Sequence, residues 1–268
     1  MTHRRKPKHK QRRKTKPQSV APVTTDKAAT DKSPIEKLPR NRLLDSLRGL
    51  AIVLMVIDHA AGILFQQPLS EWNIRFATRL SMPLFCVLMG YFLKQTKPFR
   101  WQRVIEVAVA CILVNVVFQP FYGKIEILGC LLIAYLLFQA LGRYYYPFVL
   151  AILFYTIVPD GQWFDFPVTL TVSFVAIGVI LRQFGIGPAA GCAAAISCGA
   201  FAIREFQPSG VNHLLCYFVL PATLLVYAGT KRPNWSVPGL DLIGRYPLTC
   251  YVVQYYMVFG IAHFGGSI

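Results

Sequence analysis

Two ionisable residues stand side by side in the first long apolar stretch of the sequence, LRGLAIVLMVIDHAAGILF at residues 47–65. These are Asp58 and His59. A neutral imidazole beside a carboxylate is what a general base needs, because the acid fixes the tautomer and stabilises the imidazolium that forms. A structural reading is equally open, in which Asp58 forms an interhelical ion pair and His59 is only hydrogen-bonded. The pattern predicts one of these two roles without choosing between them.

The second apolar stretch, WNIRFATRLSMPLFCVLMGYFL, also carries charge within it. Arg75 and Arg79 are four residues apart and share one face of a helix. A charged side chain at this depth costs at least about 2.5 kcal/mol on insertion scales, so Arg79 should pair with Asp58 or face a cavity. We expect Pro83 to bend this helix by removing a backbone hydrogen bond.

Further arginines lie where helices are expected to begin. Arg48 precedes His59 by eleven residues, about 16 Å of helical rise, so the two would mark opposite ends of a possible path through the protein. In the stretch KQTKPFRWQRV, Arg100 and Arg103 are three residues apart on the opening turn of a helix. Two guanidinium groups so placed could bind one phosphate group. Glu106, one turn later, is the expected ion-pair partner of Arg103.

The composition of the chain indicates which class of protein carries these residues. Of the 268 residues, 54% are hydrophobic and the mean hydropathy is +0.45, far above the values of a soluble domain. Nine apolar stretches have membrane-spanning character, at 45–66, 74–93, 103–121, 125–141, 145–158, 166–182, 186–203, 211–229 and 242–264. The sequence therefore predicts an all-α, polytopic integral membrane helix bundle of about nine (eight to ten) transmembrane helices.

The beginning of the chain differs in kind. Residues 1–48 contain 15 of the 28 Lys and Arg but 4 of the 12 Asp and Glu, and residues 1–41 contain few large apolar side chains. We expect 1–41 to be a disordered basic cytoplasmic tail that binds anionic lipid headgroups, and 42–268 to be the transmembrane domain. Nucleic acid is the less favoured partner for this tail.

Loop charge gives an orientation. With the N-terminus in the cytoplasm, the inner connections carry nine Lys and Arg against four at the outer ones, which places the C-terminus outside the cytoplasm. All seven Cys fall in apolar runs without metal-like spacing, so no metal site is expected.

Several of these stretches resemble the acyltransferase-3 family of integral membrane acyltransferases. Arg48, ten intervening residues and His59, followed by Arg100-x-x-Arg103, are similar to two motifs of the family. LLDSLRGLAIVLMVIDHAAG is similar to its opening helix, SMPLFCVLMGYFL to its second and IGRYPLTCYVVQYYMVFGI to its closing helix. The resemblance covers residues 42–122 and 242–264. The heparan-α-glucosaminide acetyltransferase group and the TraX pilin acetylases show related features.

This resemblance implies a reaction. Arg48, Arg100 and Arg103 would bind the phosphates of cytoplasmic acyl-CoA, with acetyl-CoA as the expected co-substrate. His59 would then act as general base or carry the acyl group itself, with Asp58 orienting it and Arg79 stabilising the oxyanion or binding the acceptor.

The acceptor implied by the resemblance is a hydroxyl or amine of a glycan, glycolipid or peptide in the membrane or cell envelope, outside the cytoplasm. Arg75 and Gln254 are the residues assigned to bind it. Gln254 departs from the family, whose relatives often have a His at that position.

Two other classes of function remain open. In a transporter or flippase, Asp58, His59 and Arg79 would relay protons or bind an anionic headgroup. In a non-catalytic membrane component, the basic tail would recruit a partner such as the ribosome or acidic lipid.

Overall fold

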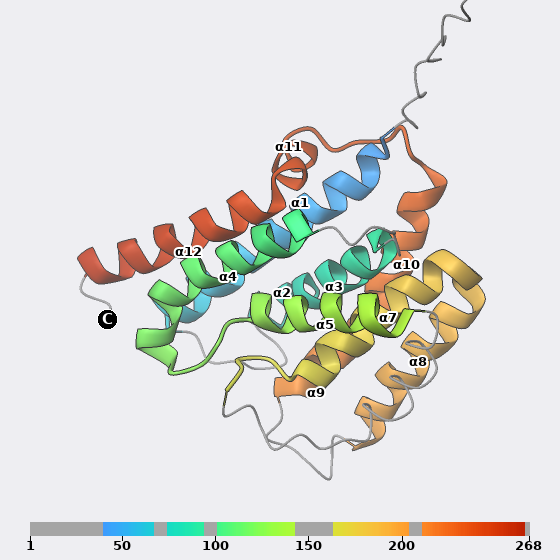
Figure 1. The fold of residues 1–268 in the computed structure, drawn as a ribbon, viewed down its shortest axis with the longest axis horizontal. Helices are drawn as coiled ribbons and strands as arrows, with labels where there is room; N and C mark the ends of the chain where they lie inside the picture. The colour runs from blue at the N-terminus through green and yellow to red at the C-terminus, as the bar shows by residue number, and fades with distance from the viewer. Residues whose placement is uncertain (1–39, 67–73, 94–100, 143–162, 204–210, 266–268) are drawn as a thin grey trace, which may run out of the picture. The chain divides into compact units, whose positions relative to one another are not determined.

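The computed structural model describes residues 40–66, 74–93, 101–142, 163–203 and 211–265, and in these ranges the chain is helical (Figure 1). Apart from one isolated bridge between Ile125 and Phe164, they contain no β-structure. The all-α prediction is confirmed. The helices are α1 (Arg42–His59), the π-helix η1 (Ala60–Leu64), α2 (Ile74–Thr78), α3 (Ser81–Phe92), α4 (Trp101–Tyr122), α5 (Ile127–Leu141), α7 (Val168–Phe184), α8 (Ile186–Ile203), α9 (Val211–Tyr217), α10 (Val219–Lys231), α11 (Leu240–Arg245) and α12 (Pro247–Phe264).

Three described helical segments are long and apolar enough to cross a membrane: Arg42–Leu64, Trp101–Tyr122 and Leu214–Lys231. The helices α5, α7 and α8 are apolar but shorter. Apolar side chains also cover the exposed face of α4, where Ile105, Ile112 and Val116 are 58–65% exposed, as lipid contact would require. The count of about nine spans stays a prediction. The fifth stretch, 145–158, lies outside the described residues, and so does nearly all of the tail.

The second predicted span is two helices. Arg79 and Leu80 form a turn between α2 and α3, so the expected single helix bent at Pro83 is wrong. Pro83 is the third residue of α3 and so lies in its first turn. Backbone N–H groups in the first turn have no partner within the helix, so the N–H that proline lacks removes no helical hydrogen bond. The stretches at 211–229 and 242–264 are likewise interrupted, at Phe218 and at Tyr246.

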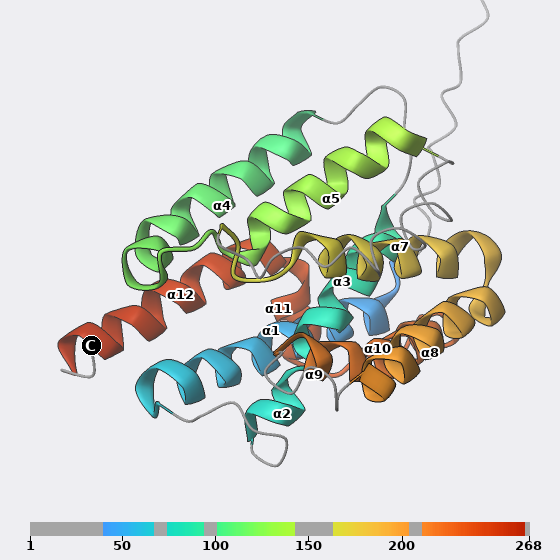
Figure 2. The same cartoon turned by 90° about the horizontal axis from the view of Figure 1, so that it is seen from below.

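Helix α1 lies at the centre of the packing. It contacts α3, α10, α11 and α12, while α4 and α5 lie side by side and α4 also contacts α12 (Figure 2). At the contact of α1 with α11, a Cβ atom added to Gly49 or to Gly244 would overlap backbone of the opposite helix. Because glycine lets the two backbones touch, the contact fixes how α11 sits against the start of α1.

Candidate active site

His59 is the last residue of α1, where the chain passes into the π-helix η1. Short π-helical segments occur often at functional sites. The imidazole packs on the Tyr255 ring of α12, with the ring centroids 4.7 Å apart. Its Nε2 atom is 3.2 Å from the Tyr255 hydroxyl, while Nδ1 is buried and has no hydrogen-bond partner among the described residues.

Behind Tyr255 lies a buried carboxylate that the sequence analysis did not select. Glu126 precedes α5 as its N-cap and is 1% exposed. Its Oε1 accepts hydrogen bonds from the hydroxyls of Tyr255, at 3.0 Å, and of Tyr251. Its Oε2 accepts from the Leu128 backbone N–H at 2.9 Å. The four side chains form one continuous polar chain, from His59 through Tyr255 and Glu126 to Tyr251.

Asp58 points to a different set of partners. It is 8% exposed, accepts a hydrogen bond from Thr78 Oγ1 at 2.9 Å, and lies 3.4 Å from both Arg75 Nε and Arg79 Nη2. The interhelical ion pair between Asp58 and Arg79, expected from the cost of burying either charge alone, is present. Its geometry places the Asp58 carboxylate toward α2 and the adjoining turn, whereas the described ring partner of His59 is on α12.

The five residues predicted to act in catalysis or acceptor binding therefore fall into two groups: Asp58 pairs with Arg75 and Arg79, whereas His59 contacts α12, which carries Gln254. Arg75 also packs against η1, since a Cβ added to Gly62 would meet its guanidinium carbon at 3.0 Å. Gln254, one residue before Tyr255, is 4% exposed, and neither amide atom has a partner among the described residues. A buried amide without partners indicates a place where a ligand could supply them.

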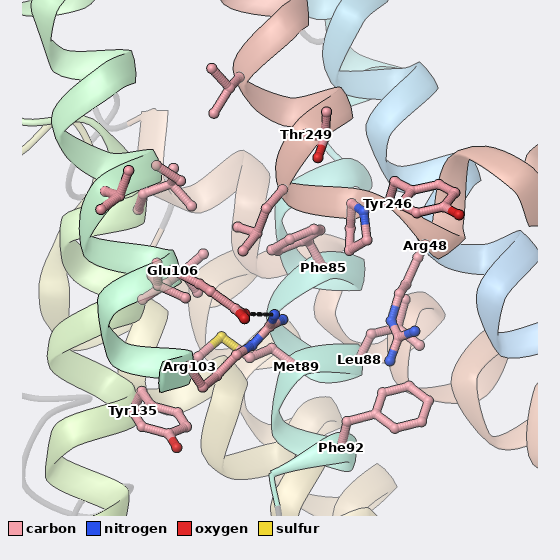
Figure 3. A pocket seen from close by; sticks show the side chains of 18 of the residues that line it. Arg48, Phe85, Leu88, Met89, Phe92, Arg103, Glu106, Tyr135, Tyr246 and Thr249 are labelled. Carbon is pink, nitrogen blue, oxygen red and sulfur yellow. Dashed lines mark hydrogen bonds and ion pairs between the residues drawn. The ribbon is translucent and has the colours of Figure 1, made fainter. Parts of the chain in front are cut away.

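A cavity of about 1280 Å³ lies toward the other end of α1, and apolar side chains form most of its wall. Arg48, Arg103, Arg182 and Arg245 also line it, each from a different helix, against the single acidic lining residue Glu106. Figure 3 shows Arg48 of α1 and Arg103 of α4 at the same cavity, with Phe85, Leu88 and Met89 of α3 between them. Arg100 lies outside the described residues.

Each of these guanidinium groups is held in place by a neighbour. Arg48 Nη1 is 2.8 Å from Asp45 Oδ1, and the group lies over the Phe92 ring, 3.9 Å from its centroid. Arg182 donates a hydrogen bond to the Tyr91 carbonyl at 3.0 Å. The expected ion pair of Arg103 with Glu106 is present at 2.9 Å. Because each arginine keeps unused donors, the cluster is suited to bind an anion with several oxygens.

His59 is not among the described residues that line this cavity. A row of aromatic rings lies between them. Phe85 lines the cavity and is 6.2 Å from the Tyr251 ring, which is 5.5 Å from the Tyr255 ring that contacts His59. This cavity by itself therefore does not form the path expected between Arg48 and His59, and the row of ring contacts links the cavity to His59.

Five residues of this region were not predicted from the sequence: Glu126, Tyr251, Tyr255, Arg182 and Arg245. One signal for Glu126 was available, since a carboxylate opening an otherwise apolar helix must find hydrogen-bond donors. Tyr251 and Tyr255 are four residues apart and so share a helix face. Arg182 and Arg245 are among the Lys and Arg of the inner connections, which predict only the orientation of the chain. Among the described residues, no three His, Cys, Asp or Glu side chains gather as a metal site would require.

Taken together, these features define a membrane protein with two sites: a cavity lined by four arginines, and a buried polar cluster formed by His59, Tyr255, Glu126 and Tyr251. The acyltransferase-3 family model, described as an acyltransferase domain, matches residues 41–126 and supports membership of that family. The match spans α1 to α4 and ends at Glu126, so the first part of the resemblance is confirmed, while the closing helix lies beyond the matched residues. No curated protein and no solved structure matches the chain.

Proposed function

We propose that this protein is an integral membrane acyltransferase that moves an acyl group, an acetyl group in the simplest case, from cytoplasmic acyl-CoA to a hydroxyl or amine. The acceptor is a glycan, glycolipid or peptide at the membrane or outside the cytoplasm. The family match supports the reaction class. The observation that supports the choice of donor is the cavity itself, whose mostly apolar wall also carries four arginines.

An acyl-CoA suits such a cavity because its charge is concentrated at one end. The phosphates would lie among Arg48, Arg103, Arg182 and Arg245, where planar guanidinium groups can pair with phosphate oxygens. The pantetheine arm would follow the wall toward Phe85. Arg100, whose spacing from Arg103 first suggested this role, is proposed as a further phosphate ligand.

Chemistry would take place at His59. The imidazole takes the proton from the acceptor O–H or N–H as the acceptor atom attacks the thioester carbon. The carbon–sulfur bond then breaks, and the leaving thiolate receives the proton from the imidazolium. Arg79, held by Asp58, would stabilise the oxyanion of the intermediate, and Arg75 and Gln254 would bind the acceptor.

This mechanism requires one conformational step. His59 does not line the cavity, and in this mechanism the Phe85 and Tyr251 rings, which link the cavity to Tyr255, would move aside to let the thioester reach His59. Closure of this kind would also keep water from the thioester until the acceptor is bound.

The proposal can be tested with purified protein in lipid nanodiscs, radiolabelled acetyl-CoA and a membrane extract as the source of acceptor. We expect label transfer by the wild type, loss of transfer in His59→Ala, and a raised KM for acetyl-CoA in the double variant R103A/R182A. Arg232→Ala removes a guanidinium that lies outside the cavity lining and should behave as the wild type.

Equal label transfer in all four proteins would refute the assignment. Substrate flux across the membrane without acetyl-CoA turnover would instead favour the transporter or flippase, in which Asp58, His59 and Arg79 relay protons or bind an anionic headgroup.

A further inference from the structure

We infer that Tyr255 and Glu126 hold His59 in the tautomer protonated at Nε2, so that Nδ1 is the atom that takes the acceptor's proton. The inference rests on the proposed function and deepens it, because it names the reacting atom and the two residues that position it. Glu126 and Tyr255 are positioning residues in this scheme, since they act through the imidazole.

The two carboxylate oxygens of Glu126 face three hydrogen-bond donors. Oε1 faces the hydroxyls of Tyr251 and Tyr255, and Oε2 faces the Leu128 N–H. A carboxylate with three donors around it is an acceptor at every contact. The single hydroxyl proton of Tyr255 is therefore directed to Glu126, at 3.0 Å.

The oxygen of Tyr255 then has only lone pairs left for His59. Because His59 Nε2 is 3.2 Å from that oxygen, the contact is a hydrogen bond only if Nε2 carries the proton and donates it. In a neutral imidazole with Nε2 protonated, Nδ1 keeps a free lone pair. The hydrogen-bond direction along the chain thus runs from His59 to Tyr255 to Glu126.

The surroundings of Nδ1, the other ring nitrogen, agree with this tautomer. Among the described residues, Nδ1 is buried without a partner, and the neighbouring Asp58 carboxylate is taken by Thr78 and two arginines. A buried lone pair without a donor is costly unless a ligand supplies one. The O–H or N–H of an acyl acceptor would be that donor.

Packing holds the positioning residues still. Glu126 is tied at its backbone as well, because its N–H donates to Asn115 Oδ1 of α4 at 3.0 Å. The Tyr255 ring lies between Phe118, 5.9 Å away, and Phe259, 6.2 Å away. The hydroxyl of Tyr255 consequently has little freedom to leave its place between His59 and Glu126.

Nitrogen NMR of the protein labelled with ¹⁵N-histidine and reconstituted in nanodiscs tests the tautomer without any need for turnover. His59→Gln identifies the His59 signals among the five histidines of the chain. We expect a protonated Nε2 and an unprotonated Nδ1 in the wild type, and a mixture of tautomers in Tyr255→Phe.

Tyr256→Phe is the matched control, since it removes a hydroxyl one residue away that donates to the Leu113 carbonyl instead. It should leave the His59 signals unchanged. In the transfer assay, Tyr255→Phe should lower kcat, because only part of the His59 population keeps the Nδ1 lone pair free, and leave the KM for acetyl-CoA unchanged.

A wild-type spectrum with the proton on Nδ1 would overturn the inference, and so would a Tyr255→Phe spectrum identical to that of Tyr256→Phe. These outcomes are distinct from failure of the proposed function. A wild type that shows the expected tautomer but turns over no acyl-CoA would refute the transferase and leave the positioning chain standing.

Discussion

Replacing Glu126 by alanine should destabilise the protein far more than any surface carboxylate does. The change removes the acceptor of three hydrogen bonds, from Tyr251, Tyr255 and the Leu128 N–H, all of them buried. Each buried donor left unpaired costs about 1–3 kcal/mol. Buried water and lipid-phase partners recover part of this, so we expect a loss of about 3 kcal/mol in the free energy of unfolding.

Glu106→Ala is the matched comparison. Glu106 forms an ion pair with Arg103, but its side chain is 45% exposed. Exposed ion pairs contribute only about 0–1 kcal/mol to the free energy of unfolding. Unfolding of both variants can be followed in mixed micelles by titration with SDS, monitored by circular dichroism. The midpoint for Glu126→Ala should fall well below those of the wild type and Glu106→Ala.

Glu126→Gln separates hydrogen bonding from charge. Its amide oxygen can still accept from the two tyrosines, but its amide N–H₂ would face the Leu128 N–H, so its midpoint should lie between the other two. If Glu126→Ala unfolded together with Glu106→Ala, the polar chain would not hold α5 and α12 together. Glu126 would then not hold the Tyr255 hydroxyl in place either.

Three further changes test the cavity and the helix contacts. Arg182→Ala should raise the Kd for acetyl-CoA about tenfold, since a hydrogen bond to a charged group is worth about 1.5–3 kcal/mol. Arg232→Ala should leave this Kd unchanged, and isothermal titration calorimetry measures both values. Gly244→Ala should cost about 1–3 kcal/mol, because its Cβ would overlap the Asp45 carbonyl, and the same SDS titration would reveal it. Phe85→Trp should lower kcat by enlarging the aromatic barrier while the Kd for acetyl-CoA stays unchanged; a parallel loss of binding would contradict a barrier at this position.

Much of the helical fold could be predicted from hydropathy. The stretches at 103–121, 125–141, 166–182 and 186–203 coincide closely with α4, α5, α7 and α8, because a run of apolar residues without helix breakers has few alternatives. The interruptions could not be predicted in the same way. The turn at Arg79 falls inside an apolar run, and the guanidinium is accommodated there by Asp58 of another helix.

The residues of the candidate site also divide into those that the sequence could predict and those that only packing brings together. Spacing within single helices was sufficient to select Arg48, Asp58, His59 and Arg79. It gave no indication that Glu126 would meet Tyr255, because 129 residues separate them and each is local to a different helix. Arg182 and Arg245 were visible as charges at helix ends, but only packing brings them to one cavity with Arg48 and Arg103.

The sequence by itself determined that this is a helical, apolar protein whose first helix carries a histidine beside an aspartate, and its motifs pointed to the acyltransferase-3 family. These properties are local, since side-chain hydropathy and helical spacing act over a few residues. The tertiary structure alone decided which polar group meets which. Buried donors and acceptors must find partners within the protein, and the partners within reach are set by contacts between helices far apart in the chain.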